Sequence, residues 1–207
     1  MRPDLDLGPQ FRKVDLSTLS SHPPIVGSPT APSVWAGLWP NEAATQAFAE
    51  QLSAALQKWP GGRDARIELR GNLGAGKTTL VRHLLRAAGV TGRIKSPTYA
   101  VVEPHQAGTG TSEGDSAWPI WHFDFYRFND PQEWEDAGFR DIFAGPGLKL
   151  MEWPDKVAGQ LPPPDWVIAI DAIDQDQRRV HISAATERGQ HWLQTWAQTH
   201  PESGHAG

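Results

Sequence analysis

The sequence predicts an α/β fold in which a mostly parallel central sheet with antiparallel edge strands lies between layers of helices. Two observations carry this prediction. A glycine-rich segment of the kind that holds phosphate groups follows a short apolar strand and opens a helix. Beyond it, apolar strands alternate with helical patterns, and closely spaced strands indicate hairpins at the edges. Together these observations indicate a three-layer sandwich like that of the P-loop NTPases.

The phosphate-binding motif runs from Gly71 to Thr78 and reads GNLGAGKT, which matches GxxxxGK[ST]. Its glycines, Gly71, Gly74 and Gly76, allow backbone angles closed to other residues, so successive N–H groups can converge on phosphate oxygens. Lys77 would place its ammonium against the β- and γ-phosphates, and Thr78 would offer a hydroxyl to Mg²⁺. The residues expected to bind the nucleotide here are Asn72, Leu73, Gly74, Ala75, Gly76, Lys77, Thr78 and Thr79. The alternative is a glycine-rich turn with a solvated lysine.

The composition bounds the class of protein. With 207 residues, 39% of them hydrophobic, and ten Trp, the chain suits one α/β domain with a sizeable core. A net charge of −5 argues against holding nucleic acid mainly by counterion release, so any link to RNA is expected to be indirect. The lack of cysteine excludes disulfides and thiolate zinc sites. We see no segment of signal-peptide or membrane-spanning character and expect a cytoplasmic protein without a membrane contact.

The chain divides into a flexible extension, residues 1–33, and a P-loop ATPase domain, residues 34–200. The extension is rich in Pro, Ser and Asp and lacks sustained periodicity, so it cannot bury enough surface to offset ordering entropy. Within the domain, Val34–Trp39 is predicted as a strand. Asn41 is predicted to cap a helix whose apolar face continues to Trp59.

The middle of the domain contains the motif and three predicted strands. RIELR at 66–70 alternates as a strand does, and 79–88 has helical spacing and stops at a glycine. Residues 99–102 are predicted as a strand and 104–118 as a long surface loop. IWHFDFY at 120–126 is predicted as the next strand.

The remainder alternates between strands and breaks. Asn129-Asp130-Pro131 opens a short helix, with proline at its first turn. Strands are then predicted at 148–151 and 166–170, and a strand at 180–184 is expected to pair beside the latter.

Three strands end in an acid that could serve a phosphate loop: Asp124, Glu152 and Asp171. A P-loop needs a carboxylate at the end of a nearby strand to hold Mg²⁺ and orient the attacking nucleophile. Spacing alone does not rank the three. Asp171 starts a turn, where an acid is ordinary surface chemistry, whereas Asp124 and Glu152 lie among aromatic residues, where an acid is costly without a metal or a donor.

Two nearby features have open interpretations. His122 could be a base or a ligand, but we expect it on the face opposite Asp124, where it would make a structural hydrogen bond. Ser96-Pro97-Thr98 is a rigid turn about twenty residues after the loop. It could be a switch that senses the γ-phosphate or an ordinary turn.

Six segments, in order between Val34 and Trp196, closely resemble the bacterial TsaE family. They are WPNEAAT (39–45), GNLGAGKTTL (71–80), KSPTYAVVEP (95–104), HFDFYR (122–127), DPQEWEDAGFRD (130–141) and MEWPDKV (151–157). The chain departs from the family at Trp134, where an aliphatic residue is more common, and at Asn41, where an acid is common. The departure at Trp134 is expected to alter a contact surface, and the departure at Asn41 is expected to alter binding of the nucleotide base.

The resemblance implies an ATPase required for threonylcarbamoyladenosine (t6A) modification of tRNA. Such a subunit works with TsaB and TsaD, turns ATP into ADP, and does not itself transfer the threonylcarbamoyl group. By motif, Thr78 and Glu152 would hold Mg²⁺, Lys77 would hold phosphates, Asp124 would position or activate the water, and Thr98 would report the γ-phosphate. tRNA would be contacted only indirectly.

The resemblance also bears on three residues outside the loop. Trp153 is expected near the nucleotide or, equally, in the core. Asn41 and Thr45, around the start of the first long helix, are expected to line the adenine side.

Two other classes of function compete with this one. A P-loop small-molecule kinase would use Asp124 to accept a proton from a substrate hydroxyl, but such kinases usually carry an arginine-bearing lid. The late pair Arg178-Arg179 is instead expected near a strand. A nucleotide-dependent binding module or GTP switch is the other alternative, and no NKxD-type segment that would read guanine is present. The acids Glu133, Glu135, Asp136 and Asp141 could form a partner-docking face or an ordinary solvated helix surface.

Overall fold

The computed structural model describes residues 34–97, 100–108, 117–130 and 132–201. The strands of this part are β1 (Val34–Trp39), β2 (Arg66–Arg70), β3 (Val102–Ala107), β4 (Trp118–Asp124), β5 (Leu148–Glu152), β6 (Trp166–Ala172) and β7 (Arg178–Ala184). The helices are α1 (Glu42–Lys58), α2 (Lys77–Ala87), α3 (Gln132–Asp136), α4 (Arg140–Ala144) and α5 (Glu187–Thr199), with 3-10 turns η1 (Gly62–Asp64) and η2 (Pro154–Val157). The predicted extension 1–33 lies outside the described residues, so the division of the chain at residue 34 stays a prediction.

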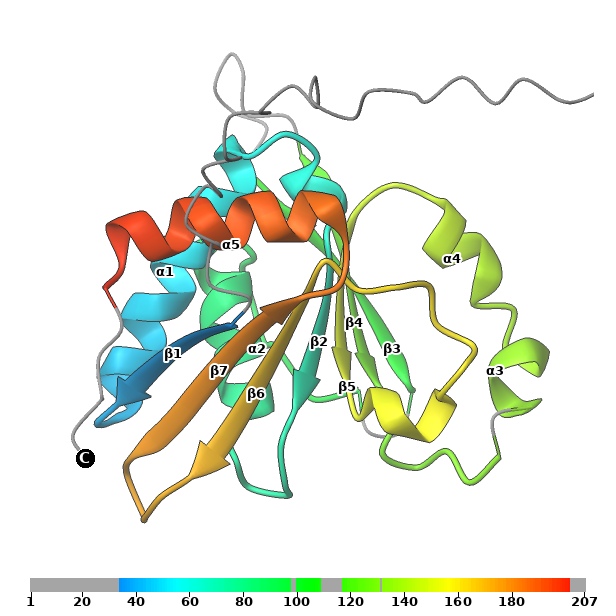
Figure 1. The fold of residues 1–207 in the computed structure, drawn as a ribbon. Coiled ribbons are helices and arrows are strands. Elements are labelled where there is room, and N and C mark those ends of the chain that lie inside the picture. Colours follow the sequence, from blue (N-terminus) through cyan, green and yellow to red (C-terminus); the bar gives the residue numbers. More distant parts are fainter. Residues whose placement is uncertain (1–33, 98–99, 109–116, 131, 202–207) are drawn as a thin grey trace, which may run out of the picture. The chain divides into compact units, whose positions relative to one another are not determined.

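The strands form one sheet in the order β1-β7-β6-β2-β5-β4-β3 (Figure 1). Its four central strands are parallel: β2 pairs with both β5 and β6, and β4 pairs with β5. The strands toward the two edges run antiparallel, because β7 pairs antiparallel with both β6 and β1, and β3 pairs antiparallel with β4. This arrangement confirms the predicted fold class.

The local predictions hold best where short-range chemistry decides the structure. Asn41 caps α1, and its side chain accepts a hydrogen bond from the N–H of Ala44. α2 ends beside Gly89, which has φ 87°. The predicted strands at 66–70, 148–151, 166–170 and 180–184 all exist with small changes of boundary.

The prediction for the segment before β4 was wrong. The strand expected at 99–102 begins only at Val102 and continues to Ala107, through residues expected to lie in the surface loop. Pro104 lies within β3, which is an edge strand, where a proline need not donate to a neighbour. Val101 immediately before it has φ 65°, and its carbonyl accepts a hydrogen bond from the N–H of Asp124. β4 also ends at Asp124, not at Tyr126.

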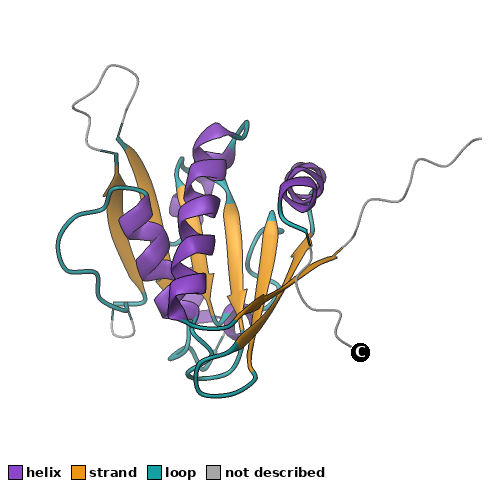
Figure 2. Cartoon of the chain, turned by 90° about the vertical axis from the view of Figure 1, so that its left-hand side faces the viewer, coloured by secondary structure: helices purple, strands orange, loops and turns teal. Residues whose placement is uncertain are grey.

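One face of the sheet carries the main core. Residues in register on adjacent strands face the same side, and Trp35, Ile182, Ile168 and Leu69 all lie in one buried cluster. Buried side chains of α1, α2 and α5 complete this cluster. Figure 2 shows the sheet twisting across the molecule with the long helices along it.

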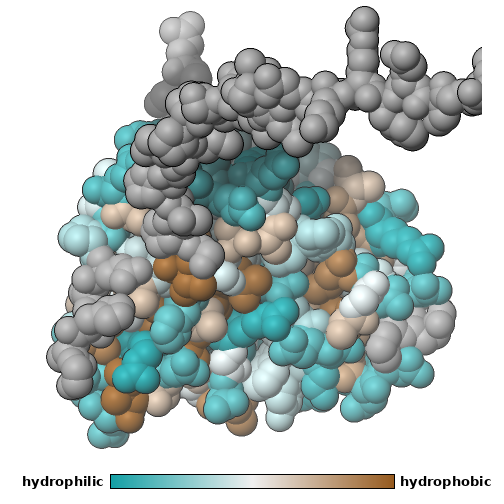
Figure 3. All heavy atoms as spheres, viewed as in Figure 1, coloured by the Kyte–Doolittle hydropathy of each residue, from teal (hydrophilic) through white to brown (hydrophobic). Residues whose placement is uncertain are grey.

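The opposite face is covered only in part. α3, α4 and η2 close over β4 and β5 with an aromatic cluster that includes Phe123, Phe125 and Phe139. Trp134 is 1% exposed within this cluster, so the expected contact surface at this position is instead core. Over β6 and β7 the outward residues stay partly or fully exposed, Val167, Ala169 and Arg179 among them. Figure 3 shows hydrophobic and hydrophilic residues side by side in the view of Figure 1.

Candidate nucleotide site

The phosphate-binding loop has the predicted setting of strand, loop and helix. It follows β2, and α2 begins at Lys77. Gly71, Gly74 and Gly76 have φ 142°, 78° and 111°, values that other residues rarely adopt. At Gly71 a side chain is also excluded by space, because a Cβ atom would lie 2.3 Å from the carbonyl oxygen of Ile170. The three glycines therefore have backbone angles of the kind that the motif predicts.

Lys77 lies inside the loop. Only 4% of the residue is exposed, and its Nζ donates to the carbonyl oxygens of Gly71 at 2.6 Å and Asn72 at 3.0 Å. The same atom lies 3.9 Å from the ring centroid of Trp153. Burial lowers the pKa of Lys77, and the carboxylates of Glu152 and Asp124 oppose part of that shift. The ammonium is thus held at the loop by carbonyls that an anion could replace.

The structure ranks the three acids that the sequence left open. Asp124 and Glu152 end the adjacent parallel strands β4 and β5, lie directly in register, and are 4% and 2% exposed. The hydroxyl of Thr78 donates to Glu152 Oε2 at 2.9 Å. Asp171 is exposed and faces the other side of the sheet, since it lies an odd number of residues from the core-facing Ile170.

The acids and the loop enclose a cavity of about 270 Å³. Besides residues Leu73 to Thr79 of the loop and α2, its walls contain Ser96, Asp124, Tyr126, Glu152 and Trp153. Ser96 Oγ donates to Asp124 Oδ2 at 3.2 Å, and the N–H of Tyr126 donates to Oδ1 at 3.1 Å. The start of the predicted switch turn therefore touches the predicted catalytic acid. Thr98 lies outside the described residues, so its role stays a prediction.

His122 belongs to this site, and the expectation that it faces away from Asp124 was wrong. Residues two apart along a strand share a face. His122 Nε2 lies 2.8 Å from Glu152 Oε1, and the His122 side chain is fully buried. Within the described part of the chain its Nδ1 has no partner. The expected structural hydrogen bond exists, and it fixes the carboxylate that Thr78 also contacts.

Thr45, which is predicted to line the adenine side, borders a separate, smaller cavity of about 120 Å³ beside the loop. Thr45, Ala75, Gly76 and Thr79 all line it, together with residues of the β6–β7 turn. Asn41 is exposed and is not among the lining residues, and its side chain caps α1. The base contacts of Asn41 and Thr45 stay predictions.

Sequence reasoning missed Arg178, which lines the same cavity. The expectation that Arg178 lies near a strand is confirmed by β7, but its contact with the loop was not predicted. Its Nε donates to the carbonyl oxygen of Ala75 at 2.9 Å, and Nη1 donates to carbonyls of the β6–β7 turn. No local pattern could have shown this, because it depends on the antiparallel return of β7 beside β6.

The donor set suits magnesium held with a nucleotide. Among the described residues no group of three His, Cys, Asp or Glu side chains could hold a metal unaided. Mg²⁺ in nucleotide sites is usually bound by one or two protein oxygens together with phosphates and water. Thr78 and Glu152 supply two adjoining oxygen ligands of the required type, so the residues present fit the ion.

Two of the four acids that could form a docking face or an ordinary helix surface make internal contacts. Glu133 Oε1 accepts the backbone N–H groups of Asn129 and Asp130, and Glu135 Oε1 pairs with Arg140 at 2.7 Å. These two acids fix the ends of the short helices.

Comparison with known proteins identifies the family. The sequence model described as "Threonylcarbamoyl adenosine biosynthesis protein TsaE" matches residues 39–180. The chain belongs to the TsaE family. A TsaE protein of Haemophilus influenzae, named for tRNA threonylcarbamoyladenosine biosynthesis, is 35% identical over 158 residues, which are 76% of this chain and 94% of that protein. The Bacillus subtilis TsaE protein is 34% identical over 154 residues, 74% of this chain and 87% of the relative.

A solved structure agrees with the TsaE assignment. The crystal structure of Bacillus subtilis YdiB superposes with a TM-score of 0.60 at 26% identity, covering 80% of this chain and 95% of YdiB. The matched TsaE region spans the P-loop, both buried acids and Arg178. Within the described residues, no helix combines the length and apolar character needed to cross a bilayer.

Proposed function

We propose that this TsaE family member is a magnesium-dependent ATPase that supports t6A modification of tRNA, working with a TsaB–TsaD-like complex. One observation carries the chemical part. A hydroxyl of the P-loop helix contacts a buried carboxylate at the end of the neighbouring parallel strand, Thr78 to Glu152 at 2.9 Å. That pair, beside the Lys77 ammonium, is what a triphosphate with magnesium requires.

Each residue has a definite task in this proposal. The loop amides and Lys77 bind the phosphates, and Thr78 and Glu152 would hold Mg²⁺, which neutralises charge on the phosphates. Asp124 orients the attacking water, since its carboxylate lies in the same cavity. Ser96, which contacts Asp124, couples the following turn to this acid. Trp153 packs over Lys77 and limits water access.

Membership of the family supports a proposal about the partners. Relatives are named for t6A biosynthesis, and we propose that this chain enters that process as the ATPase subunit of a threonylcarbamoyl transferase complex. Contact with tRNA is indirect, in keeping with the net charge of −5. A cytoplasmic location stays a prediction. No contact among the described residues favours the kinase alternative, because the Arg178 side chain is engaged with the loop and with the β6–β7 turn.

The test compares ATP binding and phosphate release in matched variants. Lys77→Ala and Glu152→Ala should abolish magnesium-dependent turnover, and Asp124→Asn should lower turnover while keeping ATP binding. Asp171→Asn is the control, because this exposed acid also lies at the end of a strand adjacent to β2. If Lys77→Ala and Glu152→Ala hydrolyse ATP like the parent, the site assignment is wrong. Adding the TsaB and TsaD proteins should raise the weak basal rate.

A further inference from the structure

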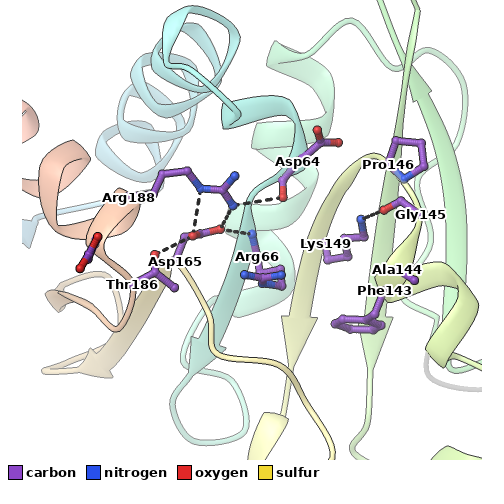
Figure 4. A pocket seen from close by; sticks show the side chains of 11 residues that line it. Asp64, Arg66, Phe143, Ala144, Gly145, Pro146, Lys149, Asp165, Thr186 and Arg188 are labelled. Atoms are coloured by element: carbon purple, nitrogen blue, oxygen red, sulfur yellow. Dashed lines mark hydrogen bonds and ion pairs between the residues drawn. The ribbon is translucent and has the colours of Figure 1, made fainter.

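A second cavity, of about 760 Å³, lies at the end of the sheet opposite the P-loop, and Figure 4 shows side chains that line it. It opens where β2, β5 and β6 begin, whereas the nucleotide site lies where β2, β4 and β5 end. Its walls come from η1, the α4–β5 connection and the start of α5. The proposed ATPase chemistry does not use any of these residues.

Two cations lie side by side on neighbouring strands in this cavity. Arg66 of β2 and Lys149 of β5 are in register, so both point to the partly covered face. Like charges directly opposite one another destabilise a sheet. Lys149 is also only 2% exposed. Burial lowers the pKa of Lys149, Asp64 opposes part of the shift, and the Arg66 guanidinium adds to it.

Neither cation is neutralised by a contact within the described residues. Lys149 Nζ donates to the carbonyl oxygen of Gly145, and Arg66 Nε donates to that of Pro163 at 2.9 Å. Neither side chain forms an ion pair in this part of the chain. Asp64, the acid near Lys149, accepts the N–H of Gly147 at 2.6 Å. Asp64 offsets the cost of this buried ammonium only in part, and a further anion would lower the cost of burying it beside a second cation.

The third cation of the cavity, Arg188, is already paired with an acid and forms part of the cavity wall. Arg188 binds Asp165 through Nε at 3.1 Å and Nη2 at 2.6 Å, and the hydroxyl of Thr186 donates to the same carboxylate at 2.7 Å. The backbone N–H of Arg66 donates to Asp165 as well, at 2.9 Å. Figure 4 shows Asp165 at the centre of these contacts. The network fixes the backbone of Arg66.

The composition of the walls favours a carboxylate over a phosphate. Three acids line the cavity with the three cations, namely Asp64, Asp165 and Glu187. A phosphate dianion would meet this negative charge, whereas a single carboxylate needs only Arg66 and Lys149. The cavity also adjoins the open part of the sheet face, where Val167 is partly buried and would be covered by a protein.

We propose that this cavity is a docking site for an acidic side chain of a protein partner, whose carboxylate bridges Lys149 and Arg66. The Asp64 and Glu187 carboxylates at its rim accept N–H groups of the same peptide segment. Because this cavity is separate from the nucleotide site, the docking proposal and the proposed ATPase activity can be tested independently of each other.

The test uses the full chain and two short probes. Acetylated, amidated Gly-Glu-Gly should shift the backbone amide NMR signals of Gly145 and Gly147, with a dissociation constant of about 1–10 mM, as expected for a single bridged carboxylate. The Gly-Gln-Gly counterpart should not. Lys149→Met should abolish the shifts, and Lys156→Met, at an exposed lysine, should preserve them.

Three results would overturn the proposal. They are equal shifts by the two peptides, shifts by inorganic phosphate but not by the glutamate peptide, and shifts that survive in Lys149→Met. If Lys149→Met does not bind the glutamate peptide, a measurement of its stability distinguishes loss of the docking site from damage to the fold. Because the ammonium forms no ion pair within the described residues, Lys149→Met should unfold at the same urea concentration as the parent or higher. A lower urea midpoint would count against the proposal as well, because it would mean that the ammonium is a structural element of the fold.

Discussion

Replacing His122 tests how the carboxylate of Glu152 is positioned. In His122→Leu the side chain keeps roughly its volume but loses the hydrogen bond of 2.8 Å to Glu152 Oε1. Both groups are buried, at 0% and 2% exposed, so water cannot readily replace the lost partner. A hydrogen bond to a charged group contributes about 1.5–3 kcal/mol. At about 1.4 kcal/mol per tenfold change, that energy corresponds to about 10- to 150-fold.

We expect this loss to appear in the magnesium dependence of ATP turnover. The magnesium concentration for half-maximal rate should rise about 10- to 100-fold in His122→Leu, because residues that orient a metal ligand usually matter by that factor. His122→Gln is the matched control, since its amide can place an N–H donor near the position of Nε2. It should restore most of the parent's magnesium affinity.

A steady-state titration with magnesium at fixed ATP makes this measurement, with circular dichroism to confirm folding. The reasoning is refuted if folded His122→Leu and His122→Gln need the same magnesium concentration as the parent. It is also refuted if both variants lose affinity equally, because then the imidazole matters for its shape and not for the hydrogen bond.

Three further changes have defined outcomes. Gly71→Ala should lower the free energy of unfolding by about 2 kcal/mol or more in urea titrations, because its Cβ would lie 2.3 Å from a carbonyl oxygen of β6. In the control Gly92→Ala, which has open space around the new Cβ, the free energy of unfolding should fall by about 1 kcal/mol. Asp165→Asn should lose about 2 kcal/mol at pH 7. Burial alone would raise the pKa of Asp165, but its hydrogen bonds from a guanidinium, a backbone amide and a hydroxyl lower it below the ordinary 3.8. Their stabilisation is therefore present above that pH and is lost as the pH falls through the folded-state pKa. If the difference in unfolding free energy between parent and variant stays the same in acid, this explanation is wrong. Arg178→Met should weaken ADP binding about tenfold in calorimetry through loss of its hydrogen bond to the loop, while Arg179→Met should bind as the parent does.

The sequence could predict much of the site because the P-loop is a local device. Its glycines, its lysine and its hydroxyl act within eight consecutive residues, so their spacing already fixes which backbone conformations are possible. The cap at Asn41 was predictable for the same reason, since a side chain three residues from its N–H partner needs no tertiary contact. The alternation of strands and helices likewise indicated the parallel centre of the sheet.

Only the tertiary structure could choose among Asp124, Glu152 and Asp171, because strand order and register decide which strand ends meet. The same holds for Arg178, which reaches the loop only because β7 returns beside β6. β3 was misplaced because a proline breaks a central strand but is tolerated at an edge, and edge position is a property of the whole sheet. The sequence by itself determined the phosphate loop, whose chemistry lies in neighbouring residues. The acids, the histidine and the opposed cations of Arg66 and Lys149 depend on contacts between distant segments, and only folding brings those segments together.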